Sequence, residues 1–201
     1  MNLSGLKLKI RDMVQEYSEN WLTEAMLTEM INTSIKQISA ESLVLRKLFN
    51  STISDENHIS LPDDFLNSIA LKINGKIYRK VNFEDIEFLS PLDKAHYVIN
   101  NNLYLNEKTS GDVELLYNYF PEELVEDDDT LDPMFNGFEL MIAYHVVSEL
   151  HGMDGKTEEQ GFKYRIFQTH LNTFKRVRTS SEMGIAIFKK INTTSFWGGK
   201  R

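Results

Sequence analysis

Apolar residues recur with helical spacing at both ends of the chain but not in its middle. Residues 3–17 and 23–49 each repeat apolar side chains three, four and seven positions apart, as amphipathic helices do. The same kind of spacing returns over residues 133–151 and 157–178. Neither pair of helices can bury its apolar stripe alone, so the N-terminal pair and the C-terminal pair must pack together.

Capping residues indicate where these helices begin and end. Thr23 is the predicted N-cap of the second helix, and Asp132, which precedes a proline, starts the third. Gly152 stands where the third helix is expected to end. Thr157, with a glutamine three residues later, forms a capping box for the last helix. The core stripe predicted for that helix is Tyr164, Phe167, Leu171 and Phe174.

The middle of the chain, residues 52–120, has the alternation typical of strands. The stretch "ISLPDDFLNSIALKINGKIYRKV" contains an Asn74-Gly75 hairpin signal. A two-residue loop would place Ile73 opposite Lys76, whereas a three-residue loop would place it opposite Ile77. The second choice gathers the apolar residues on one face, so it is favoured, with Gly75 in the left-handed conformation.

The second half of this region predicts a short helix and three more short strands. The helix covers residues 83–89 and ends before a proline. The strands are expected to turn at residues 100–102 and again at residues 110–112. From residue 113 to 119, apolar and polar side chains alternate, which indicates a sheet with one buried face.

These segments together predict an α+β protein. Its core is a four-helix core built from the N- and C-terminal helix pairs, with an inserted small antiparallel β subdomain and an extended C-terminal tail. The expected boundaries are a helical bundle of residues 1–51 and 121–178, a β subdomain of residues 52–120, and a tail of residues 179–201.

Composition narrows the class of protein. The chain has no cysteine, which excludes disulfides, thiolate chemistry and cysteine metal sites. No apolar run approaches the roughly 20 residues that span a bilayer, and the N-terminus does not have the pattern of a secretory signal. We therefore expect a protein without a membrane partner, made and used without export.

The charge is distributed unevenly along the chain. The net charge of −8 combines a net of +8 over residues 161–201 with a net of −16 over the first 160 residues. An acidic body argues against binding DNA phosphates, and no helix-turn-helix or stacking platform is visible. The basic last helix is either a solvated face or a surface that contacts a partner or a neighbouring copy. Its basic residues are Lys163, Arg165, Lys175, Arg176 and Arg178.

Two groups of titratable side chains are candidates for a catalytic or metal site. His145 and Glu149 are four residues apart on one helix, but a two-histidine zinc motif needs a second histidine where Glu149 stands. His151 lies well round the helix from His145. The acidic run at residues 126–129 lacks the spacing and the glycine of a calcium loop, so a solvated linker or a patch for a basic partner is favoured. We predict no active site, metal or cofactor.

The last 23 residues, "TSSEMGIAIFKKINTTSFWGGKR", are too apolar for an ordinary disordered tail. Either this tail packs on its own domain or it occupies the groove of another protein. Its apolar residues are Ile185, Ile187, Phe188, Ile191, Phe196 and Trp197, and Lys189 and Lys190 stand among them.

The order of these segments resembles the head-to-tail connector proteins of short-tailed bacteriophages, the adaptor rings beneath the portal. Three stretches carry the resemblance: "EMINTSIKQISAES", "HISLPDDFLNSIALKINGKIYRKV" and "LLYNYFPEELVEDDDTLDPMFNGFELMIAYHVVSELHG". Together they lie within residues 5–178. Each motif is weak alone, and their order and spacing are the better evidence.

The resemblance implies a structural virion protein that works by assembly rather than catalysis. It implies a homo-oligomeric ring of about twelve copies around the DNA channel, with the C-terminal tail docked on the portal protein. Downstream tail proteins would be further partners, and genomic DNA would pass without sequence-specific binding. The expected location is the head-tail junction of the virion, after synthesis in the bacterial host cytoplasm. The alternatives are another ring or tail protein of a phage-like assembly, and a small metal-dependent enzyme using His145 and Glu149.

Overall fold

The computed structural model describes residues 1–14, 22–90 and 93–180. The chain divides into two compact units, which are described separately. Within the described part of the chain, one unit is helical and consists of Met1–Val44 with residues 121–180; the other holds Leu45–Phe120 and contains all five strands. Among the described residues, no helix is long and apolar enough to cross a membrane.

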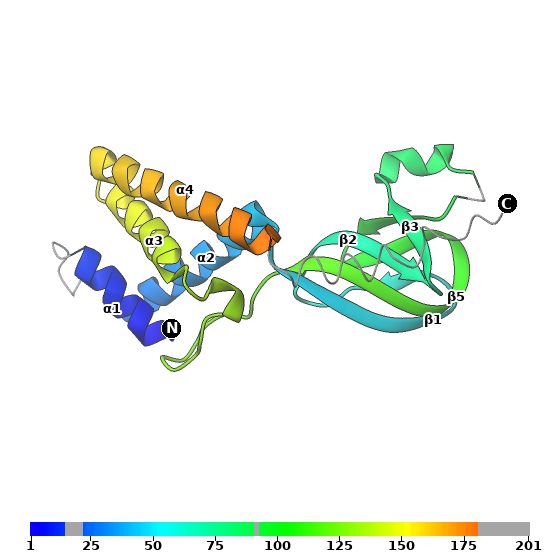
Figure 1. Ribbon diagram of the computed structural model, residues 1–201, viewed down its shortest axis with the longest axis horizontal. Coiled ribbons are helices and arrows are strands. Elements are labelled where there is room, and N and C mark those ends of the chain that lie inside the picture. Colours follow the sequence, from blue (N-terminus) through cyan, green and yellow to red (C-terminus); the bar gives the residue numbers. More distant parts are fainter. Residues whose placement is uncertain (15–21, 91–92, 181–201) are drawn as a thin grey trace. The chain divides into compact units, whose positions relative to one another are not determined.

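The helical unit is built around α3 (Glu139–Met153), which contacts the other three helices. These are α1 (Leu3–Met13), α2 (Glu24–Ser42) and α4 (Thr157–Ser180) (Figure 1). A helix that is apolar on most sides has to be buried on most sides. The side chains of α3 follow this rule, since its fully buried members are Met141, Ile142, Ala143, Val146, Val147, Ser148 and Leu150.

The amphipathic helix α4 presents one stripe to this core. Phe167, Leu171 and Phe174 are completely buried, as the spacing predicts. Tyr164, the fourth predicted member of the stripe, is 40% exposed. Phe174 stacks on Phe135 with ring centroids 5.5 Å apart, and this contact joins α4 to the short 3-10 helix η2 (Pro133–Phe135).

Two helix boundaries differ from the prediction. The Asp132 carboxylate does cap a helical turn by accepting from the Met134 amide, but that turn is η2, and α3 begins only at Glu139 because Gly137 interrupts the helix with a φ of 82°. At the other end, Gly152 lies within α3. The left-handed residue of the turn between α3 and α4 is Gly155.

The second helix is shorter than predicted. Thr23 is its N-cap, as expected, and its hydroxyl accepts from the Met26 amide. The helix ends at Ser42, because Leu43 adopts a left-handed conformation. Three residues later the chain enters strand β1 (Arg46–Ser60), which includes Phe49, instead of continuing the helix. The spacing of four residues between Leu45 and Phe49 fits one face of a helix and also one face of a strand. Hydrogen bonding to the sheet selects the extended conformation.

The β unit is a closed barrel with one additional strand. The strand order is β1-β5-β2-β3-β4, and β4 also pairs with β5, which closes four of the five strands on one another. Besides β1, the strands are β2 (Phe65–Ile73), β3 (Lys76–Lys80), β4 (Ala95–Ile99) and β5 (Asn102–Tyr119). The 3-10 helix η1 (Phe83–Phe88) precedes β4. The sheet is antiparallel except for the β3–β4 pair, which is parallel.

The predicted fold class is therefore wrong. The strands do not form a small subdomain attached to a four-helix core; they form a separate unit with its own core and its own closed sheet. Two long strands account for the difference. β1 has 15 residues and begins where helix was expected, and β5 has 18 residues and runs through the turn predicted at residues 110–112.

Strand β5 closes the barrel because it bends. It pairs with β1 on one edge over nearly its whole length, so β2 and β4 must share its other edge. Gly111 stands between these two halves with a φ of 136°, a conformation that favours glycine. Gly111 therefore does not form the predicted turn. It allows β5 to bend while the strand continues.

The β2–β3 hairpin has the two-residue loop, so the favoured three-residue alternative is wrong. Ile73 pairs with Lys76, and both Asn74 and Gly75 have positive φ angles, as a type I′ turn requires. The side chain of Asn74 also contacts the β5 bend: its Nδ2 donates to the Ser110 carbonyl at 2.8 Å and its Oδ1 accepts from the Asp112 amide at 3.0 Å. These bonds hold the turn in place although they leave Ile77 partly exposed.

Replacement of Gly111 tests this contact. A Cβ at this position would overlap the Asn74 side chain and would also strain the backbone. We expect Gly111→Ala to lower the free energy of unfolding of the β unit by about 2–4 kcal/mol, measured by urea unfolding with tyrosine near-UV circular dichroism. Gly75→Ala is the matched control, since its φ is also positive but its Cβ would meet open space, so its cost should be near 1 kcal/mol. Equal costs would contradict this account.

The barrel core contains a neutral histidine that makes its stability depend on pH. His96 is buried; its Nδ1 donates to the Tyr78 carbonyl oxygen at 3.0 Å, and its Nε2 accepts from the Ser68 hydroxyl at 3.3 Å. Burial lowers the pKa of His96 to about 4. The unfolded chain takes up this proton near pH 6.5, so the stabilisation is complete above that pH and is lost as the pH falls toward 4.

We expect the barrel to lose about 3 kcal/mol between pH 7 and pH 4 through this residue. The measurement is the urea midpoint of the near-UV signal at several pH values in the wild type and in His96→Asn. The variant should be less stable at pH 7 but should have a flatter pH profile. Parallel profiles in the two proteins would show that His96 is not the group responsible.

Candidate protein-contact surfaces

The acidic connector, residues 121–132, is held tightly against the helical unit. The Asn32 side chain makes two hydrogen bonds to the backbone of Leu124: Nδ2 donates to its carbonyl at 2.8 Å, and Oδ1 accepts from its amide at 3.0 Å. The connector also supplies acceptors to the start of α1, where the amides of Leu3 and Ser4 donate to the carbonyls of Asp129 and Asp127. The first amides of a helix have no partner inside the helix, so this contact satisfies two of them.

Two acidic side chains of the connector also stabilise the fold. The carboxylate of Asp129 accepts from the amides of Val125 and Glu126, and these bonds lower its pKa. Asp127 accepts from the buried amine of Lys7 at 2.8 Å, and Glu24 lies 3.2 Å from the same nitrogen. Burial disfavours the charged amine, but its bonds to Asp127 and Glu24 outweigh burial and raise the pKa of Lys7.

The remaining acids of the connector form an outward surface, which we call the acidic face. It consists of Glu122, Val125, Glu126 and Asp128, all exposed. Val125 is 68% exposed and precedes Glu126 directly in the chain. Glu123 is not counted with them because it pairs with Lys36. Within residues 1–14, 22–90 and 93–180, no group of three or more histidine or acidic side chains is arranged to hold a metal ion.

The structure divides the predicted basic residues of the last helix into two sets. Lys163 lies 5.7 Å from the centroid of the Tyr144 ring, and Lys175 pairs with Glu41 at 3.5 Å. Arg178 donates to the carbonyls of Met134 and Asn136, each at 2.8 Å. These three residues therefore contact their own unit and help to attach α4 to it.

The second set is defined by exposure alone: Arg165 and Arg176 lie on an exposed stripe of α4 that we call the α4 face. Its members follow each other at spacings of three, four, three and four, and therefore share one side of the helix; they are Phe162, Arg165, Thr169, Asn172 and Arg176. Phe162 is 54% exposed. No acidic residue occurs between Phe162 and Arg176, so the stripe is uniformly neutral or positive.

The structure does not assemble the histidine constellation into an accessible site. His145 is 2% exposed; its Nδ1 lies 2.8 Å from the Ser34 hydroxyl and its ring 4.5 Å from that of Phe167. Burial lowers the pKa of His145. Glu149 is exposed, and His151 is buried near the helix end. His145 thus packs between α2, α3 and α4 as a core residue.

A row of aromatic rings on the β unit was not found from the sequence. Phe83 lies 5.7 Å from Tyr97, Tyr97 stacks on Tyr104 at 5.4 Å, and His58 follows at 6.2 Å, all between ring centroids. These rings come from η1, β4, β5 and β1. Tyr104 pairs with Tyr97 on one side and with His58 on the other. Only the register shows this row, and the helix predicted through residue 49 concealed the full extent of β1.

The residues predicted to dock on a portal lie outside the described part of the chain, so the tail beyond residue 180 has no structural description here. The surfaces that are described consist of exposed charged and apolar side chains on the helical unit and of aromatic rings on the β unit. Against the curated proteins, no match was found. A family model described as SU10 adaptor protein matches residues 1–186.

The chain therefore belongs to the SU10 adaptor protein family. This match covers all the residues that the structure describes. It confirms the resemblance to phage adaptors that the order of the sequence motifs indicated. A member of an adaptor family is expected to be a component of a phage particle and to contact other structural proteins there.

The anchoring of the acidic connector can be tested at Asn32. Asn32→Ala removes both hydrogen bonds to Leu124, and we expect it to lower the free energy of unfolding of the helical unit by about 1–3 kcal/mol. Thermal unfolding followed by circular dichroism measures the cost, and hydrogen exchange should increase at residues 122–129. Asn172→Ala, on the exposed side of α4, is the control and should change neither. Unchanged exchange in Asn32→Ala would show that the connector is held by other contacts.

Proposed function

We propose that this protein is a ring-forming head-tail adaptor, located beneath the portal of a phage and joining the capsid to the tail. The observation that carries the proposal is the adaptor family match over residues 1–186. The exposed charged side chains of the helical unit are compatible with contacts between copies. Neighbouring copies form a closed ring through their helical units, and the DNA channel runs through its centre.

The C-terminal tail is the proposed portal-docking element. Its apolar residues have the composition of an interface anchor, with aromatic rings beside basic side chains. An extended segment of this kind binds by adding a strand or by inserting side chains between subunits. In this proposal Ile185, Ile187 and Phe188 enter the portal interface, and Phe196 and Trp197 form the terminal anchor.

The body of the protein suits a DNA conduit. The first 160 residues carry a net charge of −16, and such a surface does not retain phosphate groups. Genomic DNA would therefore pass without sequence-specific binding. Downstream tail proteins bind the surface of the ring that faces away from the portal, and the assembled ring remains in the virion.

The docking role of the tail predicts a defined loss of affinity. Phe188→Ser and Trp197→Ser should each weaken binding to the portal protein of the same phage by about thirtyfold, since each anchor contributes about 2 kcal/mol, and the double variant should weaken it by about a thousandfold. Surface plasmon resonance with immobilised portal measures this. Asn192→Ser with Thr194→Ser is the matched control in the same tail and should bind normally.

Limited trypsin digestion gives a second readout that does not depend on substitution. Cleavage after Lys189 and Lys190 should be fast in the free protein and should slow in the portal complex, whereas Arg178, which lies within α4, should resist cleavage in both. Native mass spectrometry of that complex then counts the copies. Normal portal binding by the double serine variant would overturn the tail proposal, and a protein that never forms a closed ring with portal would overturn the adaptor-ring proposal.

A further inference from the structure

Two surfaces of the helical unit are complementary to each other. The α4 face carries Arg165 beside an exposed phenylalanine, Phe162, and the acidic face carries three exposed carboxylates and an exposed valine. Each face therefore offers an exposed apolar side chain and a charge, and Arg165 is opposite in sign to the carboxylates of the acidic face. Opposite potentials across an interface favour association and fix its register.

Both surfaces are held rigidly in the same unit. The acidic face is anchored by Asn32, by the buried Lys7 and by the first amides of α1. The α4 face is the outer side of a helix whose opposite stripe is completely buried at Phe167, Leu171 and Phe174. Neither surface is a mobile loop, so the geometry of each is set before any partner arrives.

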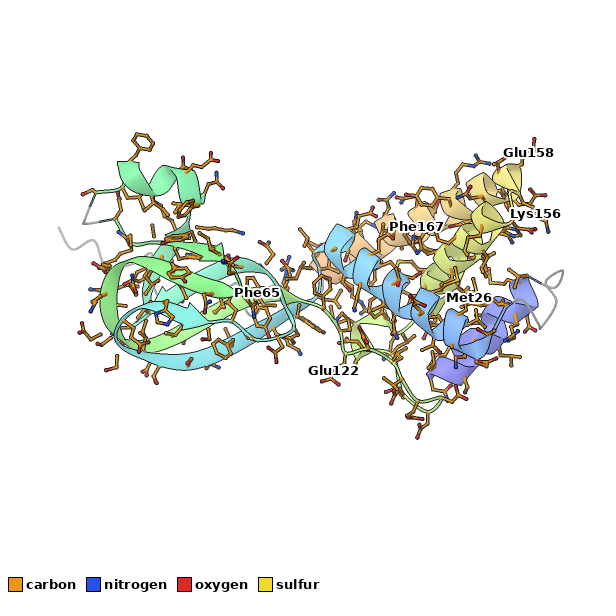
Figure 2. All side chains as sticks on the ribbon, turned by 180° about the vertical axis from the view of Figure 1, so that it is seen from behind. Met26, Phe65, Glu122, Lys156, Glu158 and Phe167 are labelled. Atoms are coloured by element: carbon orange, nitrogen blue, oxygen red, sulfur yellow. The ribbon has the colours of Figure 1, made fainter. Side chains whose placement is uncertain are left out.

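The two surfaces cannot meet within one molecule. Figure 1 shows α4 along one side of the helical unit and the connector at the opposite side. Figure 2 confirms this separation from behind, with Glu122 on the connector and Glu158 at the start of α4 far apart. A contact between them therefore requires a second copy of the chain.

We propose that the α4 face of one copy binds the acidic face of the next copy. In this contact Arg165 pairs with the carboxylates of Glu126 and Asp128, and Phe162 packs on Val125. The contact is heterologous, because each copy uses one surface to bind the copy before it and the other to bind the copy after it. Such contacts propagate from copy to copy and close into a ring where the rotation allows. This inference rests on the proposed ring and identifies the surfaces that build it.

The absence of cysteine makes cross-linking the direct test. Val125→Cys and Thr169→Cys place one thiol on each face and keep every charge. With a flexible bismaleimide, the double variant should give a ladder of dimers, trimers and longer products, because each copy offers both surfaces. Each single variant should stay monomeric, since a heterologous contact never brings two identical positions together. Leu8→Cys with Thr169→Cys is the control, with an exposed α1 position outside both faces, and should give no ladder.

Charge reversal then tests the pairing itself. Adding Arg165→Glu to the double-cysteine variant should reduce the trimers and longer products by about tenfold or more. Adding Glu126→Arg to that protein should restore them, because the two charges have been exchanged. The ladder should also shrink as salt is raised from 0.05 to about 0.5 M.

Three results would overturn the inference: no ladder from the double-cysteine variant, an equal ladder from the control, or reversal at Arg165 without effect. Native mass spectrometry of the wild type with portal separates this failure from failure of the ring proposal. A closed wild-type ring without the Val125–Thr169 cross-link would leave the adaptor role intact and assign its contacts to other surfaces.

Discussion

The burial of α3 is the constraint on which the rest of the helical unit depends. This helix has buried side chains on most of its circumference, so a single partner helix cannot cover it. Its cover comes from α1 and α2 at one end of the chain and from α4 at the other. The chain must therefore leave the helical unit after Val44 and return to it at Pro121.

The β unit can be inserted between α2 and α3 because its first and last residues are paired with each other. Arg46 lies opposite Asn118 in the sheet, and the Leu45 carbonyl accepts from both the Tyr119 amide and the Asn118 side chain. A segment whose first and last residues are neighbours can be inserted between two helices without separating them. The closure of the barrel through β5 then lets the insertion have a core of its own.

The charged residues of the helical unit have two distinct uses. Lys7, Asp127, Asp129, Lys175 and Arg178 make ion pairs or hydrogen bonds within the unit. Arg165 of the α4 face and the carboxylates of the acidic face lie outward, and each face also carries an exposed apolar side chain. Composition cannot separate these two sets, because the same residue types occur in both. Only the second set is suited to contact with another chain.

The sequence by itself determined the helices and the family. Apolar side chains at helical spacing have to be buried on one side, so α2, α3 and α4 could be located, and the Thr23 cap confirmed one boundary. The order of the motifs was sufficient to indicate an adaptor. Only the tertiary structure decided the class of fold. Whether Leu45 and Phe49 continue a helix or begin a strand, and whether Gly111 turns or bends, depends on hydrogen bonds to segments more than sixty residues away or to the Asn74 side chain. Local spacing does not contain that information, because a spacing of four residues fits one face of a helix and one face of a strand, and a glycine fits a turn or a bend. Only the pairing partner selects one of them.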